Sequence, residues 1–82
     1  MDTWTVYILH CSDHHQYIGC TNDFEERLAR HEKGYVNFTK LRLPVSVIVT
    51  IEFRDKYKAF EFEKYLKSGS GRAFAKRHFS AS

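Results

Sequence analysis

Residues 17–31, YIGCTNDFEERLARH, decide the fold of this chain of 82 residues. The segment starts as a β-strand, passes through a helix-start signal at Asn22 or Asp23, and continues as an amphipathic helix. Arg27 and His31 are four positions apart in this helix, so their side chains emerge on one face. One short segment therefore presents an arginine and a histidine together.

The apolar stripe of this helix is formed by Phe24 and Leu28. Arg27 and His31 lie at the edge of that stripe, so we expect them to face the seam between the helix and the sheet. A glycine favours the left-handed backbone that ends helices, and Gly34 is expected to stop this one. A basic side chain directed at such a seam needs a partner or a function.

The other elements follow from composition and periodicity. Strands are expected at residues 4–10, 16–20 and 45–53, helices at about 22–33, 57–67 and 72–79, and loops at 12–15 and 35–44. The run VSVIVTIEF at 45–53 is the most β-prone and is expected at the centre of the sheet. The order β-β-α-β-α-α predicts one α+β domain over residues 1–82, with a three-stranded, at least partly antiparallel sheet packed with helices.

Two tyrosines, Tyr7 and Tyr17, stand in the first two strands. They share a face only if the numbers of paired residues add up to an even number, as with Ser12 opposite Gln16. A three-residue loop at 13–15 would give this register. A shift by one residue would place the tyrosines on opposite faces.

The helix at 57–67 carries two glutamates that differ in orientation. Its buried face consists of Ala59, Phe62 and Leu66. On a helical wheel Glu63 lies roughly 60° from the centre of that face, whereas Glu61 lies about 135° away. Glu63 is therefore the carboxylate expected at the interior edge.

The net charge is only +3, but it is unevenly distributed. All ten acidic residues lie at or before Glu63. The charged residues after it are all basic, namely Lys64, Lys67, Arg72, Lys76 and Arg77. This pattern suits an anionic partner such as a nucleic acid, although a solvated helix face with a basic tail explains it equally well.

Membrane and secretion signals are not evident. No apolar run approaches the roughly 18–20 residues that a membrane-spanning helix needs, and the N-terminal MDTW does not resemble a secretory signal. We therefore expect a cytoplasmic protein with no membrane contact. In that compartment Cys11 and Cys20 are expected to be free thiols, because their spacing with the nearby histidines matches no common zinc finger.

The residues TVY at 5–7, followed ten positions later by YIG at 17–19, resemble the paired signature of the GIY-YIG nuclease superfamily. The resemblance continues through Arg27, His31, the segment FTK at 38–40 and the helix AFEFEKYLK with Glu63. The tail YLKSGSGRAFAKRH is similar to that of small stand-alone bacterial members, which resemble the N-terminal domain of a bacterial excinuclease. These motifs together cover roughly residues 4–78.

The resemblance implies a divalent-metal-dependent endonuclease that hydrolyses DNA phosphodiester bonds at a single Mg²⁺ or Mn²⁺ site. By this resemblance Tyr7 activates the attacking water and Tyr17 supports it. Arg27 stabilises charge on the phosphoryl group, and His31 assists proton transfer or orients a tyrosine. Glu63 holds the metal, and one carboxylate suffices because Mg²⁺ keeps several waters.

Two features depart from the family pattern. Thr5 stands where the first motif usually has glycine. Many members carry an asparagine after the glutamate, whereas the asparagines here are Asn22 and Asn37. Gly19 follows the pattern, and we expect it to let backbone and helix approach closely.

The expected partner is DNA, cut with low specificity or at branched, damaged or single-stranded sites in repair or recombination. Phosphate contacts are expected from Lys40, Arg42, Lys67 and Arg72. Sequence-specific cutting would need a protein partner or a homodimer.

Each assignment has a structural alternative. The tyrosines could be core aromatics, Arg27 could form a salt bridge with Glu63, and His31 could be an interface histidine. The chain as a whole could be a nucleic-acid-binding module that keeps the nuclease fold without turnover, or a small interaction domain with no nucleic acid partner.

Overall fold

The computed structural model describes residues 3–79. Its strands are β1 (Trp4–His10), β2 (Gln16–Thr21) and β3 (Ser46–Phe53), and its helices are α1 (Phe24–Glu32), α2 (Asn37–Lys40), α3 (Lys56–Lys67) and α4 (Gly69–Phe79). The predicted α+β class and the order β-β-α-β-α-α are confirmed, with the short α2 as an addition.

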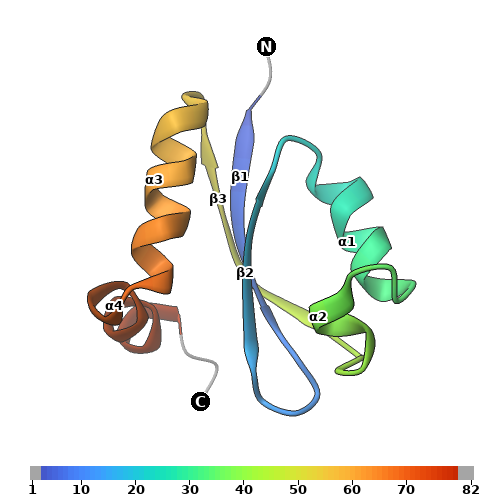
Figure 1. Ribbon diagram of the computed structural model, residues 1–82. Helices are drawn as coiled ribbons and strands as arrows, with labels where there is room; N and C mark the ends of the chain where they lie inside the picture. The colour runs from blue at the N-terminus through green and yellow to red at the C-terminus, as the bar shows by residue number, and fades with distance from the viewer. Residues whose placement is uncertain (1–2, 80–82) are drawn as a thin grey trace.

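The sheet is antiparallel throughout, with the strand order β2-β1-β3. Figure 1 shows it nearly edge-on, with α3 and α4 on one side and α1 and α2 on the other. The expectation that residues 45–53 form the central strand is wrong, because β1 is central and β3 is an edge. High β-propensity reports a fit to a pleated surface, not a position within the sheet.

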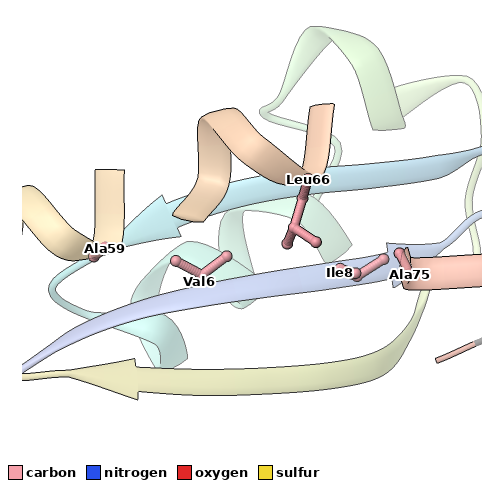
Figure 2. Packing of buried hydrophobic residues seen from close by; sticks show 5 residues of the cluster. All are labelled: Val6, Ile8, Ala59, Leu66 and Ala75. Carbon is pink, nitrogen blue, oxygen red and sulfur yellow. The ribbon is translucent and has the colours of Figure 1, made fainter. Parts of the chain in front are cut away.

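Because helices cover both faces, β1 is buried on both of its sides. Val6 and Ile8 face α3 and α4, where they pack with Ala59, Leu66 and Ala75 (Figure 2). Partly buried aromatic residues close this cluster, among them Trp4, Phe53, Phe62 and Phe74. The opposite face of β1 is left for the candidate site.

The register of β1 and β2 pairs Tyr7 with Gly19 and Leu9 with Tyr17, so the paired numbers add up to an even number. Tyr7 and Tyr17 therefore lie on one face, as an even register requires. The three-residue loop is wrong, because residues 11–15 connect the strands. Ser12 does not continue the ladder, since its backbone N–H and its hydroxyl both donate to the backbone carbonyl of Arg42, at 2.9 Å each.

Side-chain caps explain where α1, α3 and α4 begin. Asp23 caps α1 through the N–H of Glu26, and Asp55 caps α3. The segment 35–44 is not entirely a loop, because it contains α2. The sequence does not reveal α2, because a single turn is too short to show a helical period. The helix expected at 72–79 starts earlier, at Gly69, because Ser68 Oγ accepts the N–H of Gly71 at 3.1 Å.

None of the helices in residues 3–79 has the length and hydropathy that crossing a membrane would need.

Candidate active site

A buried hydrogen bond joins β1 to α1 at the centre of the site. Tyr7 Oη lies 2.9 Å from His31 Nε2, and both residues are 0% exposed. Tyr7 reaches this position because alternate residues of β1 point away from the Val6 face. His31 comes from the last turn of α1. Burying two polar groups is costly unless they are paired, and here they pair with each other.

Aromatic rings enclose this pair. The ring of Phe24 lies 5.2 Å from that of Tyr7, measured between centroids. The ring of Tyr17 lies 6.1 Å from that of Tyr7 and 4.7 Å from that of His31. Tyr17 is only half-buried, so it borders the site on the solvent side. The structure thus brings both tyrosines and the histidine together.

Gly19 leaves the space that the phenol of Tyr7 occupies. A Cβ atom at this position would lie 2.5 Å from both Cζ and Oη of Tyr7. The expectation that a helix is the close neighbour of this glycine is wrong. The neighbour is the side chain across the strand pair, because Gly19 and Tyr7 are register partners on one face.

The electrostatic field couples Arg27 to both buried groups. Burial, and then the Tyr17 hydroxyl, raise the pKa of Tyr7, while the Arg27 guanidinium beside it lowers that pKa. Burial, and then Arg27, lower the pKa of His31. At neutral pH the tyrosine is therefore protonated and the histidine uncharged, and Arg27 is the fixed positive charge next to them.

Glu63 approaches from α3, on the other side of the sheet. Its side chain is 23% exposed, whereas Glu61 points to solvent, as the helical wheel predicts. Burial is the main cause of the raised pKa of Tyr7 and of Cys20, and the Glu63 carboxylate raises both further. These two residues face opposite sides of the sheet, so Glu63 acts near the β2 edge, where the sides meet.

The ion pair of Glu63 is with Lys67, one turn further along α3, at 3.2 Å between Oε2 and Nζ. Among residues 3–79, Arg27 forms no ion pair, so the alternative of an Arg27–Glu63 salt bridge is not what the structure contains. Lys67, expected to contact phosphate, is engaged with Glu63.

The side chains available as metal ligands fit a hard cation such as Mg²⁺. Within residues 3–79 no three His, Cys, Asp or Glu side chains gather into a metal cluster, and both cysteines are free. A single half-buried carboxylate fits Mg²⁺, which keeps several waters and takes one or two carboxylates together with substrate phosphate. Glu63 meets that requirement as a single carboxylate, and in this structure its partner is Lys67.

The other expected phosphate contacts are separated in space. Lys40 is exposed on α2 and Arg72 is exposed on α4, on opposite sides of the sheet (Figure 1). Arg42 is engaged within the protein: Nε forms an ion pair with Asp13 at 3.0 Å, and Nη1 donates to the Phe38 carbonyl at 2.7 Å. It joins the β1–β2 loop to the segment after α2.

Two residues near the site were not assigned a role from the sequence. Thr39 is fully buried, and its Oγ1 lies 2.8 Å from His31 Nδ1. Phe38 is 39% exposed with its ring 5.5 Å from that of Tyr17. No period in the segment 35–44 could reveal them, since α2 makes only one turn. The sequence signal for both residues is the segment FTK at 38–40, which is part of the family resemblance but assigns neither residue a role.

Comparison with known proteins places the chain beside one family of catalytic domains. The family model for the GIY-YIG catalytic domain matches residues 3–77. The UPF0213 protein YsiG of Lactococcus lactis subsp. lactis is 41% identical over 68 residues, which make up 82% of this chain and 65% of that protein. The matched region thus spans a little less than two thirds of this relative.

The UPF0213 protein SSP2268 of Staphylococcus saprophyticus is 34% identical over 71 residues, covering 85% of this chain and 87% of that protein. The solution NMR structure of the UPF0213 protein BH0048 from Bacillus halodurans superimposes with a TM-score of 0.61 at 28% identity. The superposition covers 96% of this chain and 88% of that one.

Proposed function

The chain belongs to the GIY-YIG catalytic domain family, and from this premise we propose that it is a divalent-metal-dependent endonuclease that hydrolyses phosphodiester bonds in DNA. The observation that supports this most is the buried pair of Tyr7 and His31 with Arg27 beside it. The proposed substrates are branched, damaged or single-stranded DNA cut with low sequence specificity. Repair or recombination is the proposed context.

Arg27 is the group proposed to meet the phosphate. Its guanidinium presents several N–H donors, which match the oxygens of a phosphoryl group better than a point charge does. The same charge lowers the pKa of Tyr7, so it also stabilises the phenol when that group loses its proton.

Tyr7 and His31 are proposed to handle the proton of the attacking water. The raised pKa of Tyr7 means that its phenol is not a free base at neutral pH. His31 is the adjacent uncharged group, because burial lowers its pKa, and Nε2 is within hydrogen-bond distance of the hydroxyl. Tyr17, with its ring 4.7 Å from that of His31, holds the imidazole from the solvent side.

Glu63 is proposed to hold the Mg²⁺ or Mn²⁺ ion. When bound, the ion supplies Lewis-acid stabilisation of charge on the phosphate oxygens. Lys67, paired with Glu63 in the protein alone, has to release the carboxylate or share it.

Replacing Glu63 with glutamine is expected to lower metal-dependent cleavage by about a hundredfold, because a neutral amide binds a hard cation far more weakly than a carboxylate. The measurement is the initial rate on a supercoiled plasmid and on labelled single-stranded DNA, with Mg²⁺ or Mn²⁺ and with a chelator. Glu61→Gln is the matched control, because Glu61 lies on the same helix but is exposed; it should cleave like the wild type.

Salt-sensitive DNA binding by the wild type, with no cleavage in either metal, would rule out the proposed enzyme and identify a nucleic-acid-binding module instead. Absence of both binding and cleavage would leave an interaction domain.

Replacing Gly19 with alanine is expected to lower the cleavage rate more than tenfold, since the new methyl group collides with the Tyr7 phenol and disturbs its bond to His31. The rate is measured next to a thermal melt, so that loss of folded protein is accounted for. Gly69→Ala serves as control, because no atom lies within 4 Å of the added Cβ there. Wild-type kinetics of Gly19→Ala would contradict the proposal that Gly19 leaves room for the Tyr7 phenol.

A further inference from the structure

A third buried polar side chain, that of Thr39, stands behind the Tyr7–His31 pair. Thr39 Oγ1 lies 2.8 Å from His31 Nδ1 and 3.4 Å from the carbonyl oxygen of Val36. Thr39 is 0% exposed, as are His31 and Tyr7. The two ring nitrogens of the histidine therefore each face one buried hydroxyl group.

The direction of these hydrogen bonds follows from which atoms carry a hydrogen and which can only accept one. The Tyr7 hydroxyl carries one hydrogen, and because the group is fully buried this hydrogen needs an acceptor within the protein. Within residues 3–79 the hydrogen-bond partner of Tyr7 Oη is His31 Nε2. The phenol hydrogen therefore points to Nε2, which must be the bare, accepting nitrogen of a neutral imidazole.

The same reasoning applies to the hydrogen bond between His31 Nδ1 and Thr39 Oγ1. With Nε2 bare, the ring hydrogen is on Nδ1 and is donated to Thr39 Oγ1 at 2.8 Å. The threonine hydrogen is then free for the carbonyl oxygen of Val36, which can only accept. In the reverse direction that carbonyl would lose its hydroxyl donor, and the Tyr7 oxygen would accept from Nε2–H. The buried phenol hydrogen would then have no acceptor among residues 3–79.

We propose that Thr39 is a positioning residue that fixes the Nδ1–H tautomer of His31 and so presents a bare Nε2 to the Tyr7 hydroxyl. The catalytic meaning of this assignment rests on the proposed nuclease function, whereas the tautomer is a property of the folded chain alone. In the reaction the water proton moves to Tyr7 Oη while the phenol proton moves to Nε2. The resulting hydroxide bonds to phosphorus, and the leaving oxygen departs with the electron pair of the broken P–O bond.

The tautomer can be observed directly by long-range ¹H–¹⁵N NMR on the uniformly labelled chain, because protonated and bare ring nitrogens have very different ¹⁵N shifts. We expect wild-type His31 to show a protonated Nδ1 and a bare Nε2. In Thr39→Val, which keeps the shape but lacks the hydroxyl, this preference should weaken, and kcat should fall about tenfold to a hundredfold with KM little changed. Thr39→Ser should restore both the tautomer preference and kcat.

Thr3→Val is the matched control, because Thr3 is exposed and lies before β1; it should alter neither the tautomer nor kcat. A wild-type His31 with its hydrogen on Nε2 would overturn the proposal whatever the enzyme does. The expected tautomer in a chain that cuts no DNA would support the hydrogen-bond assignment and overturn the proposed function. Wild type and Thr39→Ser are enough to decide between these outcomes, so the test remains valid even if Thr39→Val fails to fold.

Discussion

Replacing Arg27 with alanine is expected to lower the rate of DNA cleavage by about a thousandfold, the cost of removing a preorganised donor from a site where negative charge develops. Arg27 forms no ion pair among residues 3–79 and is half-buried at the helix–sheet seam. Its loss should therefore spare the fold. Single-turnover cleavage of labelled DNA measures the effect, and a thermal melt checks the fold.

Arg30 provides a matched control on the same helix. It is exposed and pairs with Glu26 at 3.8 Å between nitrogen and oxygen, so Arg30→Ala should cost less than about threefold, as expected for a solvated surface charge. Arg27→Lys keeps the charge but loses the planar fork, and we expect it to recover only part of the rate. If Arg27→Ala cleaved within tenfold of the wild type, the assignment of Arg27 to the phosphate would fail.

Replacing Gly71 with alanine is expected to lower the free energy of unfolding by more than about 3 kcal/mol. A Cβ there would lie 1.7 Å from the carbonyl oxygen of Tyr65 and 2.6 Å from Cα of Leu66. These are backbone atoms of α3, so no side-chain rotation relieves the contact. Helix α4 would have to move away from α3, which would disturb the packing of Ala75 in the core. Urea denaturation at equilibrium measures the change.

Gly69→Ala is the internal control for this experiment. The two glycines lie two residues apart in α4, but nothing lies within 4 Å of a Cβ at Gly69. Alanine is also a better helix former than glycine, so the change should be neutral or stabilising by up to about 1 kcal/mol. Equal stability of the two variants would show that the close contact of α3 and α4 does not limit the fold.

Strand alternation and helical periodicity were enough to predict those side chains of the site whose direction depends on a single strand or helix. The alternation of β1 separates Tyr7 from Val6, and the helical period of α1 groups Arg27 with His31. The same period distinguishes Glu63 from Glu61. These relations concern residues a few positions apart, for which backbone geometry alone fixes the direction of a side chain.

Contacts between distant segments could not be predicted in this way. Arg42 binds the β1–β2 loop some thirty residues earlier in the chain, and no local pattern indicates that meeting. Thr39 reaches His31 because the one-turn α2 folds back on α1. The central place of β1 likewise depends on which strands pair, since the strongly β-prone residues 46–53 suit either position in a sheet.

The strand order also has a practical consequence for handling this protein. Tyr17 and Gly19 belong to β2, at one border of the sheet, while β3 forms the opposite border. A fluorophore or surface anchor attached through an exposed residue of β3, such as Ser46 or Glu52, would therefore leave the approach to the tyrosines open. Molecules immobilised in that orientation would present the tyrosines to labelled DNA, so the proposed cleavage could be followed one molecule at a time.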